Sequence, residues 1–343
     1  MGSSTVLLNH QSDGGDWLPP RFNRGHTYGD RVTVAESGLT ITALYAARYR
    51  HTDRDGWRQR LAAGEICRNG QPLRADGPLE AGDRLVWHRP PWQEAAVPVL
   101  AQAAIVFDDG DLLVLNKPSG LPVLPAGGFL EHTLLKQLEG WAAAGLIAAN
   151  DGVPRPVHRL GRFTSGLLVC ARRSSTRAWL SAQLRESTRA GGDGAAPGTG
   201  RSCRKVYRAL TEPLPADWQR GESREISTPI GRRPHPRLGQ LWCAVTPAEG
   251  GALAAHSTLT LLERAEGACR VQVAIATGRP HQIRIHCAAI GAPLLGDPLY
   301  GPGGSVRAGA LPGDGGYRLQ AQSLELLGVD GSRLALEAPP PPW

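Results

Sequence analysis

The chain has 343 residues, of which 41% are hydrophobic and 20% charged, so it can bury one large core or two smaller ones. It contains no run of about 18 apolar residues, which excludes a membrane-spanning helix, and its N-terminus lacks the apolar segment of a secretory signal. The six cysteines show no C-x-x-C spacing, so we expect reduced thiols in a cytoplasmic protein and no zinc site.

The formal net charge is +7, and the positive charge is concentrated in one part of the chain. Residues 1–100 carry 12 arginines against 11 acidic residues, whereas residues 151–208 carry 12 basic residues against three acidic ones. A concentrated basic stretch predicts a polyanionic partner such as RNA. The alternative interpretation is a solvated basic surface without a particular partner.

The first part of the chain predicts a small module preceded by an arm. Residues 1–31 are rich in Gly, Asp, Asn and Pro and show little periodicity, so we expect an extended N-terminal arm. Within residues 32–89, helical spacing of apolar side chains occurs in residues 40–49, a second short helix is predicted from residue 57, and short strands follow. Two small helices followed by strands indicate a compact module.

A proline-rich linker over residues 90–103 separates this module from a larger domain over residues 104–338. The larger domain contains many short strand-like segments and few helical ones, which predicts an α+β fold with a mostly antiparallel mixed sheet. Residues 190–202 and 302–316 are Gly-rich and are expected to form loops, and residues 339–343 are expected to be a tail that joins no sheet.

Sequence signatures of nucleotide-cofactor and zinc chemistry are absent. The chain has no P-loop, no G-x-G-x-x-G and no H-E-x-x-H, so neither a nucleotide cofactor nor a metal is expected. Four other segments stand out. They are LVLNKPSGL at residues 113–121, PVHRLGRFTSGLL at 156–168, RKVYRA at 204–209, and TGRPHQIRIH at 277–286, the last followed by GDPLYG at 296–301.

These segments resemble, in order and spacing, the signature segments of the RluA-type RNA pseudouridine synthases. The resemblance covers about residues 100–330, and residues 32–89 are similar to the alpha-L RNA-binding module often attached to that family. It implies a pseudouridine synthase-type sheet and an enzyme that isomerises uridine to pseudouridine in rRNA or tRNA without cofactor or metal. It also implies that the target base in structured RNA is taken out of its stack. We expect the protein to be a cytoplasmic monomer.

The resemblance assigns pocket roles to four residues. Arg159 matches the arginine that holds the flipped nucleotide, and Tyr207 matches the active-site tyrosine that packs against the target base. One of Arg279 and Arg284 corresponds to the buried arginine that pairs with the catalytic carboxylate, and the sequence leaves open which one. Contacts with RNA are expected from Arg162, Thr164, His281, Gln282 and Lys205.

Each of these assignments has a plainer alternative. Arg159 is otherwise a surface cation, Tyr207 a core residue of a strand, and His281 and Gln282 can form hydrogen bonds within their own segment. For the module of residues 32–89, a degenerate or packing role is the alternative to RNA binding, because that part of the chain is nearly neutral. Lys117, His158 and Asp297 are expected to support the structure locally.

The chain departs from the family motif at one residue. The family reads His-Arg-Leu-Asp, and its aspartate acts on the ribose, whereas the fourth residue here is Gly161, which has no acceptor, nucleophile or proton to give. A subgroup of the family with plant-type members is similar to this chain in reading His-Arg-Leu-Gly-Arg.

Three interpretations of Gly161 stay open. A carboxylate from elsewhere reaches the site, catalysis follows another route, or the protein binds RNA as a chaperone or assembly factor without isomerising it. The candidate carboxylates are Asp108, Asp109, Asp111 and Asp297.

Overall fold

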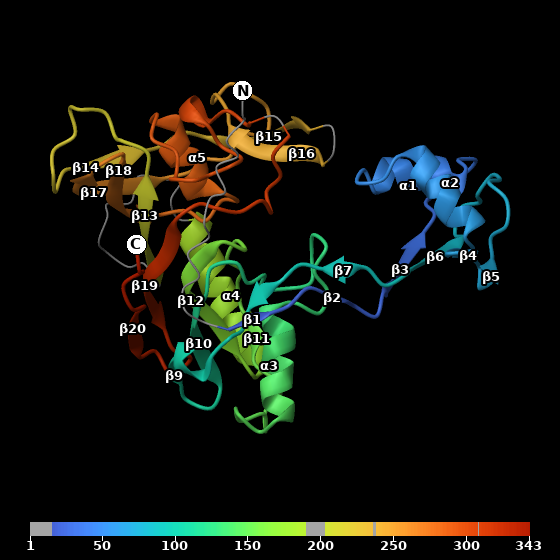
Figure 1. Cartoon of the computed structure of the whole chain (residues 1–343), viewed down its shortest axis with the longest axis horizontal. Coiled ribbons are helices and arrows are strands. Elements are labelled where there is room, and N and C mark those ends of the chain that lie inside the picture. The colour runs from blue at the N-terminus through green and yellow to red at the C-terminus, as the bar shows by residue number, and fades with distance from the viewer. Residues whose placement is uncertain (1–15, 190–202, 236–237, 308) are drawn as a thin grey trace, which may run out of the picture. The chain divides into compact units, whose positions relative to one another are not determined.

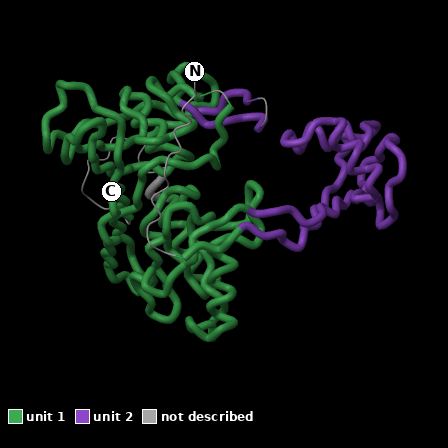
Figure 2. Tube along the Cα trace, viewed as in Figure 1, with its two compact units in different colours: residues 1–19, 95–230, 244–343 green, residues 20–94, 231–243 purple. Residues whose placement is uncertain are grey.

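Figure 1 shows the computed structural model of the chain, which describes residues 16–189, 203–235, 238–307 and 309–343. The predicted loop at 190–202 therefore lies outside the described residues. The chain divides into two compact units (Figure 2). Unit 1 comprises residues 1–19, 95–230 and 244–343, and unit 2 comprises residues 20–94 and 231–243. No described helix combines the length and the apolar content that crossing a membrane would require.

A ten-stranded sheet forms the centre of unit 1 (Figure 1). The strand order is β14-β17-β18-β13-β19-β12-β10-β9, with β11 paired to β12 and β20 to β19. Its pairings are antiparallel apart from the parallel pair β12 and β19. This sheet confirms the predicted α+β class. The strands are β9 (Ile105–Asp108), β10 (Leu112–Lys117), β11 (Arg155–Pro156), β12 (Thr164–Ala171), β13 (Cys203–Thr211), β14 (Ser223–Ile226), β17 (Ser257–Ala265), β18 (Ala268–Ile275), β19 (Leu319–Leu327) and β20 (Arg333–Glu337).

Helices cover both faces of this sheet. Leu113 and Leu115 of β10 pack into one core with Leu138, whereas Val114 packs on the opposite face with Leu180. Both faces of β10 are therefore buried, which explains why its apolar run is continuous where a half-exposed strand would alternate. The α-helices of unit 1 among the described residues are α3 (Leu134–Ala143), α4 (Ser174–Arg189) and α5 (Gln282–Ala289).

A further core joins α5 to the other end of the sheet. Leu259 of β17 and Val273 of β18 pack in one cluster with Ile283 and Cys287 of α5. The motif that begins this helix is therefore placed where β18 ends. Two 3-10 turns, η2 (Gln102–Ala104) and η4 (Pro302–Gly304), belong to the connecting segments of unit 1, and η4 falls in the predicted loop at residues 302–316.

Gly166 allows β12 and β19 to approach closely. Its φ is +97°, and a β-carbon at this position would lie 2.7 Å from the Ala321 backbone nitrogen and still closer to the carbonyl oxygen of the same residue. No side chain fits there, and the backbone conformation itself is one that glycine adopts without strain. The glycine of the T-S-G motif thus belongs to the sheet, and the residues just before it form the start of β12.

Unit 2 is built from two helices and a small sheet. Its four-stranded sheet has the order β3-β6-β4-β5, and Trp57, Leu85 and Trp87 lie in its core. The first helix is capped by the Thr40 hydroxyl, and the second by the Asp53 carboxylate, which accepts from a backbone N–H at 2.8 Å. The elements are η1 (Val34–Glu36), α1 (Ile41–Arg48), α2 (Arg54–Ala62), β3 (His26–Arg31), β4 (Ile66–Arg68), β5 (Gln71–Pro72) and β6 (Arg84–Arg89).

The predicted boundaries of the arm and the linker differ from the elements found. The described part of the expected arm forms strands, and β3 pairs with β6, so the unit begins before residue 32. The strand was missed because its sequence, HTYGDR, is polar and only partly buried. The remaining short strands pair as β1 (Trp17–Leu18) with β8 (Val97–Pro98), β2 (Arg21–Phe22) with β7 (Gln93–Glu94), and β15 (Ile230–His235) with β16 (Gly239–Ala244).

Candidate active site

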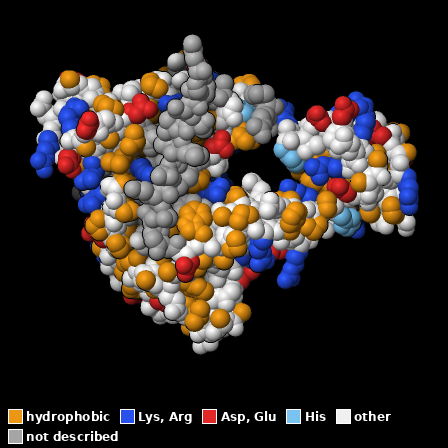
Figure 3. Space-filling model, in the orientation of Figure 1, with side chains coloured by type: hydrophobic (Ala, Val, Ile, Leu, Met, Phe, Trp, Pro, Cys, Tyr) orange, Lys and Arg blue, Asp and Glu red, His pale blue; other side chains and the backbone are white. Residues whose placement is uncertain are grey.

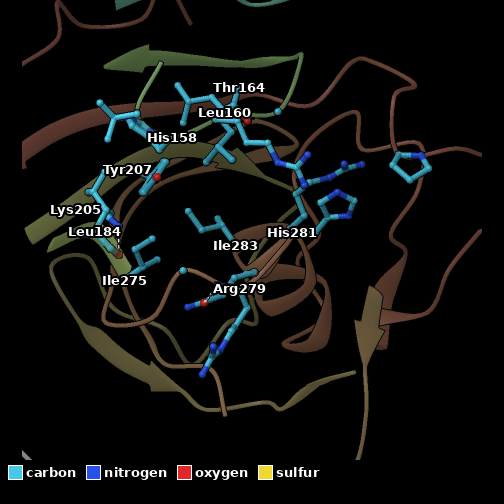
Figure 4. A pocket seen from close by; sticks show the side chains of 18 of the residues that line it. His158, Leu160, Thr164, Leu184, Lys205, Tyr207, Ile275, Arg279, His281 and Ile283 are labelled. Carbon is cyan, nitrogen blue, oxygen red and sulfur yellow. Dashed lines mark hydrogen bonds between the residues drawn. The ribbon is translucent and has the colours of Figure 1, made fainter. Parts of the chain in front are cut away.

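A cavity of about 450 Å³ lies in unit 1, where the signature segments meet (Figure 4). In the close-up, Lys205 and Tyr207 from β13 lie on one side and His281 on the other. The remaining walls come from the segment before β12, from α4, from the residues between β18 and α5, and from the residues before β19. The predicted residues that line the cavity are Arg159, Gly161, Thr164, Lys205, Tyr207, Arg279, His281, Gln282 and Arg284.

The lining of the cavity is cationic. Its described lining includes no aspartate or glutamate. Because all the ionised groups share one sign, the cavity attracts phosphate groups and other anions. The basic lining residues are Arg159, Arg185, Lys205, Arg279 and Arg284.

Arg284 is the buried arginine that the sequence could not distinguish from Arg279. Its side chain is 4% exposed and donates from Nε and Nη2 to the two carboxylate oxygens of Asp297, both at 2.7 Å. This bidentate pair supplies the counter-ion that a buried guanidinium requires. Arg279 is partly exposed, and its Nε donates to the carbonyl oxygen of Ala254 at 2.9 Å.

The four candidate carboxylates do not line the cavity. Asp108 is held by Arg172 through two hydrogen bonds of 2.9 Å. Asp109 and Asp111 bond to backbone N–H groups at the β9–β10 turn and the start of α4. Asp297 contacts Arg284, and its Oδ1 also accepts from the backbone N–H of Leu299 and Tyr300. Within the described residues, no carboxylate replaces the missing aspartate from inside the cavity.

Two polar side chains in the cavity, Tyr207 and His281, are uncharged at neutral pH. Tyr207 lies in β13 between Val273 of β18 and Ala321 of β19, and desolvation raises its pKa to about 12, so it keeps its hydroxyl proton. Burial lowers the pKa of His281 to about 4, and its Nδ1 pairs with the Tyr300 hydroxyl at 2.7 Å. His281 precedes α5 with a left-handed backbone, φ 57°.

Other predicted residues serve the structure around the cavity. The Gln282 side-chain oxygen accepts from Thr277 and the Arg279 backbone, and its nitrogen donates to His256 and Ser257, so its amide bonds within its own region. His158 Nε2 accepts from a backbone N–H of β12 at 3.1 Å, and burial lowers its pKa to about 4. Both are therefore held by neighbouring protein groups.

Arg162 and Lys117 lie outside the cavity lining. Arg162 donates from Nε to the carbonyl oxygen of Gly120 and packs over the rings of Phe129 and Phe163. Lys117 is fully buried, and its ammonium donates to three carbonyl oxygens at 2.9 to 3.0 Å. The expected local support by Lys117 agrees with this geometry, whereas the RNA contact expected of Arg162 is not supported by a place in the cavity lining.

Among the lining residues that the sequence did not indicate are Arg185 of α4 and Tyr317. Tyr317 follows the predicted loop at residues 302–316 and directly precedes β19, and its side chain is buried against the cavity. No pattern drew attention to it, because it stands in none of the signature segments. Its proximity to Gly161 and Thr164 appears only once the chain is folded.

The RNA pseudouridylate synthase family matches residues 111–289 of this chain. A Synechocystis protein described as an uncharacterized RNA pseudouridine synthase is 39% identical over 87% of this chain and 93% of its own length. This chain belongs to the RNA pseudouridylate synthase family. It is thus a member of a family of isomerases that act on RNA, and the resemblance noted in the sequence is confirmed.

A second relative is similar to part of this chain, and a solved structure is similar to its fold. The ribosomal large subunit pseudouridine synthase D of Zymomonas mobilis is 34% identical over 57% of this chain and 55% of its own length. The solved structure of human RNA pseudouridylate synthase domain containing 4 covers 70% of this chain and 89% of that one, with a TM-score of 0.51 and 22% identity, and shows the same fold.

Proposed function

We propose that this protein is a catalytically competent pseudouridine synthase that isomerises uridine in structured RNA. The N1–C1′ bond of the nucleotide breaks, the base turns within the cavity, and C5 bonds to C1′. A base inside a stack cannot enter the cavity, so the target nucleotide is flipped out first. The observation that carries the proposal is the convergence of Arg159, Tyr207 and Arg284 on one cationic cavity in unit 1.

The lining residues suit different parts of a flipped nucleotide. Arg159 is exposed, and no ion pair to it is present within the described ranges, so its guanidinium can meet a phosphate. Arg185 and Arg279 add positive charge for the neighbouring phosphates. Tyr207 presents a protonated phenol on the cavity wall and can pack against the base.

We propose rRNA as the substrate class, with tRNA as the alternative. The name of the Zymomonas mobilis relative refers to the large ribosomal subunit, and that relative shares 34% identity with this chain. We further propose that the protein acts as a cytoplasmic monomer without cofactor.

For unit 2 we propose a packing role in place of a strong grip on phosphates. Several of its arginines are paired with acids: Arg48 with Asp30 and Glu36, and Arg68 with Asp83. On the face drawn in Figure 3, the Lys and Arg side chains of this unit lie among Asp and Glu side chains. Paired cations release fewer counter-ions from RNA than unpaired ones, so this unit adds little affinity.

The proposal is tested with purified protein and unmodified transcripts of rRNA and tRNA. After digestion to nucleosides, pseudouridine is measured by chromatography and mass spectrometry. We expect product from at least one transcript, and an Arg159→Ala variant is expected to lose activity. Arg58→Ala is the matched control, because Arg58 is exposed in unit 2 and paired with Asp55.

The acid-free lining favours one competing function, that of an RNA-binding protein without isomerase activity. Such a protein would bind the transcripts with the same dependence on Arg159 and would form no pseudouridine from any of them. Tight binding without product would therefore replace the proposed activity with this one.

A further inference from the structure

The space beside Gly161 is taken by a phenol. A β-carbon at residue 161 would lie 2.5 Å from the hydroxyl oxygen of Tyr317 and 3.2 Å from that of Thr164. The φ of Gly161 is not in the left-handed region, so its backbone conformation does not require glycine. The residue that excludes an aspartate at this position is Tyr317, and its hydroxyl lies where the aspartate side chain would begin.

Tyr317 is held in a defined position. Its side chain is 4% exposed, and its hydroxyl lies 3.3 Å from the Thr164 hydroxyl. The Arg284 guanidinium carbon lies 4.3 Å from the centre of its ring, and Asp297 accepts two hydrogen bonds from that guanidinium. The ring therefore packs against Arg284, the buried one of the two motif arginines.

We propose that Tyr317 is a catalytic residue whose hydroxyl acts on the ribose of the target uridine in place of the family's aspartate. The inference rests on the proposed function, since it assigns a group to the same reaction. A tyrosine as nucleophile at an anomeric carbon has precedent in the sialidases. Tyr317, Gly161 and Arg284 all line the cavity, so the hydroxyl is within the space that receives the nucleotide.

The proposed step needs no partner beyond the substrate. The Tyr317 oxygen bonds to C1′ as the N1–C1′ bond breaks, the electron pair stays on N1, and the phenol proton passes to N1. After the base turns, the C5=C6 electron pair forms the bond from C5 to C1′, and the C1′–O bond returns its pair to the tyrosine. The phenolate then takes the C5 proton, and the C5–H pair restores the double bond.

The proton that Tyr317 gives up and the proton that it takes back match the difference between uridine and pseudouridine. Pseudouridine carries a hydrogen on N1 that uridine lacks, and it has lost the hydrogen on C5, so one hydroxyl can supply the first and recover the second. Burial raises the pKa of Tyr317, while the neighbouring Arg284 cation opposes that shift. The resting residue is thus a phenol that carries the required proton, next to a cation that stabilises the phenolate.

The test compares wild type with Tyr317→Phe in single-turnover pseudouridine formation and in RNA binding. We expect the rate to fall about 100-fold or more, as for loss of a group that transfers protons, while RNA affinity and thermal unfolding stay close to wild type. Tyr45→Phe is the matched control: it removes a buried hydroxyl from the core of unit 2, outside the cavity. Its rate is expected to equal that of wild type.

A second pair of variants keeps an aromatic ring at residue 317 and tests the space between residue 161 and the Tyr317 hydroxyl. Gly161→Ala pushes a methyl group into the position of the hydroxyl, and we expect the same loss of rate even if Tyr317→Phe unfolds. Gly161→Asp combined with Tyr317→Phe removes the clash and provides a carboxylate, and product is expected to reappear.

The outcomes separate this inference from the proposed function. Product from wild type together with wild-type rates in Tyr317→Phe or Gly161→Ala would overturn the role of Tyr317 and leave the enzyme active. A loss of rate in Tyr317→Phe that is matched by the loss of RNA affinity would show a structural role and overturn it also. Absence of product from wild type would refute both proposals.

Discussion

At the scale of single residues, the site is organised around the buried cation Arg284. Asp297 neutralises it through two hydrogen bonds of 2.7 Å, and the ring of Tyr317 packs against the guanidinium. A buried guanidinium without a counter-ion is costly, so the absence of an aspartate at residue 161 is tolerated because Asp297 serves the arginine from outside the cavity lining. In this chain, therefore, Asp297 is the counter-ion of Arg284, and a different residue, Tyr317, is the one proposed to act on the ribose.

The Arg284–Asp297 pair predicts a large loss of stability when it is broken. Asp297→Asn leaves a buried cation without its counter-ion, and we expect the free energy of unfolding to fall by about 3 kcal/mol. Urea unfolding measures the change. Glu325→Gln is the control, because it breaks the exposed pair with Arg204, and little effect is expected there. Equal effects of the two substitutions would contradict the account of Arg284.

A second residue-scale prediction concerns His286 of α5. Its Nδ1 pairs with the Ser257 hydroxyl at 2.9 Å and its Nε2 with the Thr228 carbonyl oxygen at 3.0 Å, and burial lowers its pKa from 6.5 to about 4. The folded protein then binds fewer protons than the unfolded chain between these two values. The stability from the neutral ring is complete above pH 6.5 and is lost as the pH falls toward 4.

His158 and His281, whose pKa values are also about 4, contribute to the same loss. In urea unfolding between about pH 7 and about pH 5, His286→Gln is expected to reduce the slope of the unfolding free energy against pH by about 1 kcal/mol per unit on average. Glutamine does not titrate but can still accept and donate. A variant with the wild-type slope would show that His286 titrates alike in the folded and unfolded states.

The sequence predicted many of the residues that line the cavity but not all of them. Arg159, Tyr207 and Arg284 were found because they stand in motifs with recognisable neighbours. The choice between Arg279 and Arg284 required burial, which a pattern of two arginines five residues apart does not reveal. Tyr317 was beyond prediction, because its closeness to Gly161 depends on a contact between residues 156 positions apart, across strands β12 and β19.

At the scale of elements, the parallel pair β12 and β19 brings the two halves of the site together. Gly166 combines a φ of +97° with direct contact to the Ala321 backbone. We expect Gly166→Ala to cost about 3 kcal/mol, from backbone strain together with overpacking. Gly110→Ala is the matched control, since its φ is +96° but no atom lies within 4 Å of a β-carbon there, so only the strain of about 1 kcal/mol remains.

Urea unfolding of the two glycine variants checks this difference, and similar losses would show that β12 and β19 can separate to admit a methyl group. Strands with a continuous apolar run, such as β10, were predictable because both faces are buried. The strand β3 was not, because its side chains are polar and its place is set by backbone pairing with β6. Pairing between segments distant in the chain leaves little trace in local composition.

At the scale of the whole molecule, we assign the affinity for RNA to arginines of unit 1 and not to the overall net charge of +7. Arg159 and Arg185 line the cavity, whereas Arg58 of unit 2 is paired with Asp55. We expect Arg159→Ala and Arg185→Ala each to reduce the slope of log affinity against log salt by about 1, and Arg58→Ala to leave it unchanged. Filter binding over a salt series measures these slopes, and equal changes in all three variants would contradict the assignment.

The most direct measurement follows the hydrogen on C5, which leaves the base only if the isomerisation occurs. Transcripts labelled with tritium at C5 of uridine are incubated with excess wild-type protein, and tritium released to water is counted. We expect release that reaches about one equivalent per target uridine and is nearly abolished by Tyr317→Phe. Saturated RNA binding without any release by the wild-type protein would contradict this expectation.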